Sequence, residues 1–155
     1  GYKKITNSVG IKIIPSGNWV VDLQRFAEAI NNKVWSATRT DMAMIGGITN
    51  GKKAMDLSDI GGLYCEIMSW GYTLVSVANL HLMLSSNNCS FYEQPLPYET
   101  FEFGMHDVIR TNKDGYMYAP TKPGLGVEIN WDQMKTRVIH SFYCDKNKEV
   151  GLVHV

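Results

Sequence analysis

The sequence lacks an excess of charge of either sign, because its 155 residues contain 15 Lys and Arg and 15 Asp and Glu. This balance argues against a nucleic-acid or membrane partner held by bulk charge. No apolar run approaches the roughly 20 residues that cross a bilayer. The opening residues, Gly1 to Lys4, form no secretory signal. These absences predict a cytoplasmic protein.

Cysteine is also scarce. The three cysteines, Cys65, Cys89 and Cys144, are odd in number and widely spaced. Such spacing does not build a disulfide framework, and it offers no zinc-ligand pattern. We therefore expect reduced thiols in a cytoplasmic protein.

Alternating apolar patterns occupy the first part of the chain. Runs rich in β-branched and apolar residues predict strands over 9–14, 34–38, 63–68 and 90–93. Helical spacing predicts helices over 21–30, from 49 or 50 towards 61–62, and over 74–84. Beyond Pro97, Gly and Pro mark loops, with a short helical stretch over 132–138.

Repeated strand–helix units predict an α/β fold with a parallel sheet, which is either an open sheet or part of a barrel. A complete barrel of eight such units takes about 250 residues, whereas this chain has room for four units and a tail. Periodicity alone leaves both architectures open.

Several motifs favour the barrel. Residues 39–49 (RTDMAMIGGIT) resemble the sixth-strand signature of the mandelate racemase branch of the enolase superfamily, and residues 120–132 (PTKPGLGVEINWD) resemble the way these enzymes end. Three further segments, 26–30, 78–82 and 91–95, follow the family's order and spacing. The chain is thus similar to mandelate racemase and muconate lactonizing enzymes over nearly its whole length.

The resemblance implies the C-terminal half, strands five to eight, of a (β/α)7β TIM-type barrel plus a C-terminal tail. Residues 1–98 would form the partial barrel. Residues 99–155 would form a tail segment that in the family packs back on the capping domain.

Family chemistry abstracts a proton alpha to the carboxylate of a substrate such as an acid sugar. A divalent metal, Mg²⁺, and hydrogen-bond donors stabilise the enediolate that results. The resemblance therefore implies a dehydratase, an epimerase or a cycloisomerase acting on a small sugar acid that bears a carboxylate. In a TIM barrel the reacting groups stand at the carboxyl ends of strands, where this sequence presents Asn18, Asp41, Trp70 and Glu93.

Two of these positions concern the metal and the base. Asn18 falls where the family places its third metal carboxylate, and an amide there would weaken Mg²⁺ binding, or it simply belongs to a turn. Asp41 matches the aspartate that orients a seventh-strand histidine, but Trp70 occupies the histidine position and cannot take a proton. Asp41 then either binds a substrate hydroxyl or acts as a base itself, or it is structural and forms an ion pair with Arg39 or a helix cap near Gly46.

The other positions concern the substrate. Trp70 and Arg39 would line the substrate pocket, with Trp70 as a core aromatic in the alternative reading. Glu93 matches the eighth-strand carboxylate that contacts the substrate carboxylate. This role requires its protonated form or a shared proton, which burial beside another acid would supply. Its alternative is a solvated glutamate. His81, on an apolar helix face, is expected to be structural.

The family's lysine base, its first two metal carboxylates and its capping domain have no counterpart in this sequence and would lie upstream of Gly1. We therefore expect the chain alone to be inactive. Its expected partner is the missing N-terminal half or, as a homo-oligomer, a second copy of itself. The alternative function is a non-catalytic half-barrel that self-associates through two sheet edges and an apolar inner face.

Overall fold

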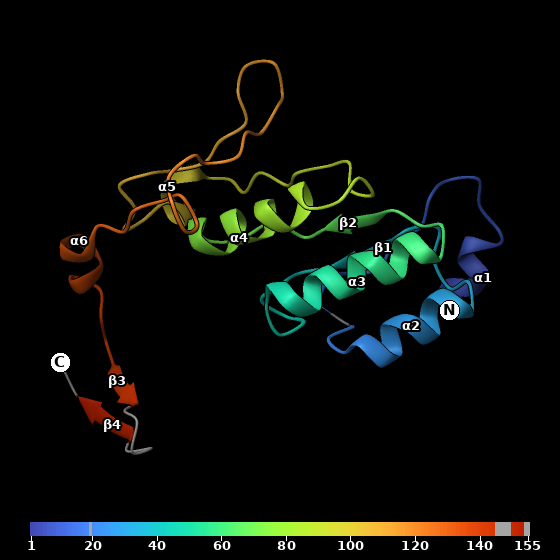
Figure 1. Ribbon diagram of the computed structural model, residues 1–155, viewed down its shortest axis with the longest axis horizontal. Coiled ribbons are helices and arrows are strands. Elements are labelled where there is room, and N and C mark those ends of the chain that lie inside the picture. The colour runs from blue at the N-terminus through green and yellow to red at the C-terminus, as the bar shows by residue number, and fades with distance from the viewer. Residues whose placement is uncertain (19, 145–149, 154–155) are drawn as a thin grey trace.

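The computed structural model describes residues 1–18, 20–144 and 150–153 (Figure 1). Within these residues the elements run in the order α1 Tyr2–Thr6, α2 Leu23–Asn31, β1 Thr38–Thr40, α3 Ile48–Ile60, β2 Cys65–Ile67, α4 Thr73–Leu84, α5 Tyr98–Phe101, α6 Trp131–Lys135, β3 Ser141–Cys144 and β4 Val150–Val153.

The middle of the chain forms the strand–helix alternation that the sequence predicts. Strands β1 and β2 pair in parallel, with Thr38 opposite Cys65 and Thr40 opposite Ile67. Helix α3 connects them and contacts both strands and the helices α2 and α4 (Figure 1). This β–α–β unit followed by a further helix agrees with an α/β fold built on a parallel sheet.

Local capping sets the first bound of α2. The Asp22 side chain accepts a hydrogen bond from the Arg25 backbone N–H at 2.8 Å, so the helix begins at Leu23 and not at the predicted residue 21. Phe26 is the residue of α2 that is fully buried against the rest of the chain.

The two faces of the sheet differ in chemistry. Side chains alternate along a strand, so Thr38, Thr40, Cys65 and Ile67 all point to the helix side. There the core gathers Phe26, Ile45, Ala54, Met55, Cys65, Ile67 and Leu82. Arg39 and Glu66 point the other way, towards what would be the interior of a closed barrel. The predicted apolar inner face is therefore wrong at these two strands, where the inner face is charged.

The first and fourth predicted strands form no ladder in the part of the chain that the structure describes. Segment 9–14 is held by the Ser36 N–H, which donates to the Ile13 carbonyl, and by the Ile13 N–H, which donates to the Ser36 hydroxyl. Segment 90–93 runs along β2 but is bonded largely by side chains. Both sequences suit extended backbone, yet a strand also needs a neighbour whose main-chain groups align with its own.

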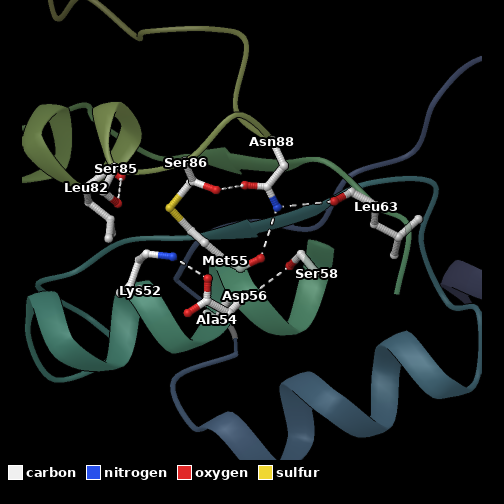
Figure 2. A network of polar contacts seen from close by, with 10 residues as sticks. All are labelled: Lys52, Ala54, Met55, Asp56, Ser58, Leu63, Leu82, Ser85, Ser86 and Asn88. Carbon is white, nitrogen blue, oxygen red and sulfur yellow. Dashed lines mark hydrogen bonds and ion pairs between the residues drawn. The ribbon is translucent and has the colours of Figure 1, made fainter. Parts of the chain in front are cut away.

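A buried asparagine secures the amino end of β2 (Figure 2). The Asn88 side chain donates to the carbonyl of Met55 in α3 at 3.0 Å and accepts from the Ser86 hydroxyl at 2.8 Å. Its backbone carbonyl accepts from the Cys65 N–H at 2.7 Å. Asn88 thus links the segment that follows α4 to strand β2 and to helix α3.

A second buried asparagine secures the carboxyl ends of both strands. Asn79 of α4 is 0% exposed. Its amide nitrogen donates to Asp41 Oδ1 at 2.9 Å and to the Met68 carbonyl at 3.2 Å. Its amide oxygen accepts from the Met42 N–H at 3.0 Å. One side chain therefore joins α4 to the residues that follow β1 and β2.

The tail differs more from the sequence-based prediction. The helix expected over 132–138 ends earlier, at Lys135. A β-hairpin that the sequence did not predict follows it, with β3 antiparallel to β4 and Ser141 opposite Val153. Figure 1 shows α6 and this hairpin at the end of the molecule away from α1 to α3.

The accessible surface of the chain is large for its size. A compact monomer of 17.5 kDa exposes about 7,900 Å², whereas this chain exposes 10306 Å². The excess is of the order that stable interfaces bury. The chain therefore exposes more surface than a compact monomer of its mass. Among the described residues, no helix is long and apolar enough to cross a membrane.

We predict that Asn79→Ala will lower the free energy of unfolding by about 3 kcal/mol, because it leaves buried partners at Asp41, Met42 and Met68 without their hydrogen bonds. Urea titration followed by circular dichroism measures this loss. Asn87→Ala is the control, since Asn87 is exposed and should change stability by less than about 0.5 kcal/mol. Equal effects of the two substitutions would contradict the prediction.

Candidate active site

The candidate active site lies where β1 and β2 end. In parallel α/β sheets the carboxyl ends of neighbouring strands meet at one edge, and loops that leave this edge carry reacting groups. Here Asp41 follows β1 directly, and Ser69 and Trp70 follow β2. Glu93 joins them from the segment beside β2, because its backbone binds the Ser69 hydroxyl.

Arg39 and Glu93 form an ion pair between the Arg39 guanidinium and the Glu93 carboxylate. Their side chains are 18% and 35% exposed, so the pair is partly shielded from water. Burial lowers the pKa of Arg39, and the nearby Glu66 carboxylate acts in the opposite direction. Among the described residues, the Arg39 Nε is buried and has no hydrogen-bond partner.

The surroundings of Glu93 differ from the expectation. The expectation was burial beside another acid, which would leave Glu93 protonated or sharing a proton. The structure places a guanidinium there, which neutralises the carboxylate by charge. The prediction of a solvated glutamate is also wrong, because the carboxylate is paired and about two-thirds covered.

Glu66 is the second carboxylate near Arg39. It is the register partner of Arg39 across the sheet. Its Oε2 accepts hydrogen bonds from the N–H groups of Ser90 and Phe91 at 3.0 and 3.2 Å, and from the Cys89 thiol at 3.6 Å. Burial raises the pKa of the Cys89 thiol to about 11. This agrees with an unreactive, reduced cysteine.

Asp41 is 4% exposed and belongs to a hydrogen-bond network. Its Oδ1 accepts from the Ala43 N–H and from Asn79, each at 2.9 Å. Arg39 forms its ion pair with Glu93, so the predicted Asp41–Arg39 pair is wrong. The carboxylate closes the turn that leads to Gly46 and accepts a hydrogen bond from the buried Asn79 amide.

Trp70 is 53% exposed, so its reading as a core aromatic is wrong. Its ring packs edge-on against Phe101 with centroids 5.0 Å apart, and Tyr72 contacts the same phenyl ring at 5.7 Å. These rings form an aromatic wall beside the carboxyl edge of β2. Such a wall can contact the C–H groups of a sugar chain.

Asn18 is exposed in a turn. The preceding Gly17 is buried, and a Cβ there would meet the Met68 side chain at 2.8 Å, so the turn needs glycine to approach the residue after β2. The turn that carries Asn18 therefore lies beside Met68, the residue after β2.

His81 contacts the tail. Its Nε2 lies 3.0 Å from the Leu125 carbonyl, which joins α4 to the loop that precedes α6. This contact fits the structural role expected for His81.

Sequence reasoning missed three polar residues that organise this site: Glu66, Ser69 and Asn79. Glu66 had a signal, because it is the one charged residue within the predicted strand 63–68. Asn79 had a weaker one, as an amide within an apolar helix. Ser69 had none, since a serine at a strand end is ordinary.

Residues 1–133 match the family model described as enolase C-terminal domain-like. The chain belongs to the enolase C-terminal domain-like family. This family assignment confirms the resemblance to mandelate racemase and muconate lactonizing enzymes that the motifs indicated.

Several named proteins and solved structures are similar to this chain. The D-galactonate dehydratase family member RspA of Pantoea ananatis is 33% identical over 122 residues, which are 76% of this chain and 28% of that protein. A Pseudovibrio crystal structure assigned to the mandelate racemase/muconate lactonizing enzymes is 35% identical, with a TM-score of 0.87 over 99% of this chain and 39% of that one.

D-glucarate dehydratase from Agrobacterium tumefaciens, solved with magnesium, is 26% identical, with a TM-score of 0.76 over 87% of this chain and 35% of that one. The chain spans about 28% of the length of the curated relative RspA. It therefore corresponds to a C-terminal part of these enzymes.

The residues at the edge do not fit a magnesium site by themselves. Among the described residues, no three His, Cys, Asp or Glu side chains gather closely enough to hold a metal ion. Glu93 is bound to Arg39, and Asp41 Oδ1 is taken up by Asn79 and Ala43. Asn18 offers one neutral amide oxygen, whereas Mg²⁺ prefers carboxylates in octahedral geometry.

We therefore predict that this chain alone binds Mg²⁺ with a dissociation constant no tighter than about 1 mM. Isothermal titration calorimetry of the chain with MgCl₂ measures it. Asn18→Asp is the matched variant, because it restores a carboxylate at the exposed turn. Micromolar binding by the unmodified chain would contradict the prediction.

Proposed function

We propose that this chain is the C-terminal part of an enolase-superfamily enzyme that abstracts the proton alpha to the carboxylate of a sugar acid, with a Mg²⁺-stabilised enediolate. The Arg39–Glu93 pair carries the proposal, because it sets a partly exposed cation at the carboxyl edge of the parallel strands, where α/β sheets bind their ligands. The names of the galactonate and glucarate dehydratases support a sugar-acid substrate.

Among the family reactions, we favour dehydration. The seventh-strand position is Trp70, which cannot remove or return a proton, so a two-base racemase is disfavoured. A dehydratase removes the proton at C2 and expels the C3 hydroxyl as water. The resulting enol becomes a 2-keto-3-deoxy acid.

Each edge residue has a part in this proposal. Arg39 binds the anionic end of the substrate through the exposed part of its guanidinium. Glu93 orients that guanidinium and lies on the side of the pocket where the substrate carboxylate binds. Trp70 covers the carbon chain. Asp41 lies at the edge, where one of its carboxylate oxygens can accept a hydrogen bond from a substrate hydroxyl.

The remaining groups would come from outside this chain. We propose that the lysine base, the metal carboxylates and the capping domain belong to the longer protein. Residues 1–98 would supply half of its barrel, and residues 99–155 would pack on its cap. The excess surface of the chain supports such a counterpart.

The first experiment extends the open reading frame upstream of Gly1 and expresses the longer protein. A panel of sugar acids, including D-galactonate and D-glucarate, is then incubated with MgCl₂, and 2-keto acid products are measured. Absence of turnover on every sugar acid would overturn the proposal.

In this longer protein we predict that Arg39→Met lowers kcat/KM by about 100-fold or more, because a positioned donor is lost and Glu93 is left without its cation. Arg25→Met is the matched control, since the Arg25 side chain is 78% exposed on α2. If both variants retain the activity of the parent enzyme, Arg39 has no part in substrate binding.

The alternative, a non-catalytic half-barrel that self-associates, has one observation in its favour, the large accessible surface. It predicts a dimer in which charged inner faces meet, with Arg39 of one copy near Glu66 of the other. Size-exclusion chromatography with light scattering measures the mass of the 155-residue chain. A monodisperse monomer would exclude this alternative, and a salt-sensitive dimer would support it.

A further inference from the structure

The segment that carries Glu93 is attached to β2 in an unusual way. It lies where a fourth parallel strand was expected, yet it makes no main-chain ladder with β2 in the described part of the chain. At its start, the Glu66 carboxylate holds the N–H groups of Ser90 and Phe91. At its end, the Ser69 hydroxyl holds Glu93.

The hydroxyl oxygen of Ser69 forms hydrogen bonds with both main-chain groups of Glu93. Its Oγ accepts from the Glu93 N–H at 2.7 Å and donates to the Glu93 carbonyl at 3.2 Å. Ser69 is 0% exposed, so it has no route to substrate. Its own backbone is fixed in turn, because the Ser76 hydroxyl of α4 donates to the Ser69 carbonyl at 2.8 Å.

These bonds decide where the Glu93 carboxylate stands. A glutamate side chain is flexible, so its charge is placed by its backbone and by its partner. Arg39, the ion-pair partner of Glu93, lies in β1, whereas Ser69 lies just after the end of β2. The Ser69 bonds therefore set the distance between a β1 cation and a carboxylate that no ladder holds.

We propose that Ser69 is a positioning residue, which replaces the missing ladder and holds Glu93 against Arg39 in the geometry that substrate binding needs. This inference rests on the proposed function of the Arg39–Glu93 pair. Displacement of a reacting group by about 1 Å can reduce rate about 100-fold, even when the substituted residue touches no substrate.

The kinetic experiment compares Ser69→Ala, Ser69→Thr and Ser58→Ala in the longer protein. Ser58 is the matched control, because it is also 0% exposed and its hydroxyl makes buried bonds, to Thr38 and to the Ala54 carbonyl, on the opposite face. We expect Ser69→Ala to lower kcat/KM by about 100-fold, Ser69→Thr to recover most of it, and Ser58→Ala to retain it. Equal kinetics for the two alanine variants at equal Tm would overturn the proposal.

A double-mutant cycle tests whether Ser69 acts through Glu93. In a Glu93→Gln background the Ser69→Ala substitution should have little further effect on kcat/KM, since the group that it positions is already lost. Full additivity of the two substitutions would show that Ser69 acts by another route.

Amide hydrogen exchange separates this inference from the proposed function, because it needs no substrate. In the 155-residue chain, Ser69→Ala should remove protection at the Glu93 amide, whereas Ser58→Ala should leave it unchanged. Unchanged exchange at Glu93 would overturn the positioning role whatever the activity. Lost protection together with an inactive longer protein would overturn the proposed function and retain the Ser69 contact.

Discussion

The carboxyl edge of the sheet depends on the fully buried amide of Asn79. Strands β1 and β2 are each three residues long, so their ladder alone fixes little. Asn79 bonds to Asp41, to Met42 and to Met68, which lie just beyond the two strands. Buried polar networks of this kind specify one arrangement, because every unpaired alternative leaves a polar group without water. The site is therefore anchored from the helix layer and not from the sheet alone.

Charged side chains on the face of the sheet opposite the helices add to the contacts that Asn79 makes. Arg39 lies between Glu66, its register partner on β2, and Glu93, its ion-pair partner. One guanidinium thus connects the strand to the segment that follows it. The inner face of these two strands is polar and charged, and a closed barrel would bury these groups further.

The sequence predicted the parts of the fold that depend on local pattern. The helices α2, α3 and α4 appear close to the predicted ranges, because apolar spacing and caps such as Asp22 act within one turn. Segments 9–14 and 90–93 were predicted as strands and form no ladder among the described residues, since pairing depends on a neighbour that local pattern does not reveal. The hairpin of β3 and β4 was missed in the loop-rich tail.

The sequence by itself determined the family, the order of strands and helices in the middle of the chain, and the residue types at the carboxyl edge. Only the tertiary structure decided which groups these edge residues contact. Glu93 meets a guanidinium and not an acid, Asp41 meets the amide of Asn79, and Trp70 lies exposed against Phe101. The physical reason is that a strand end fixes where a residue stands, whereas its charge and hydrogen bonds depend on side chains that arrive from distant segments.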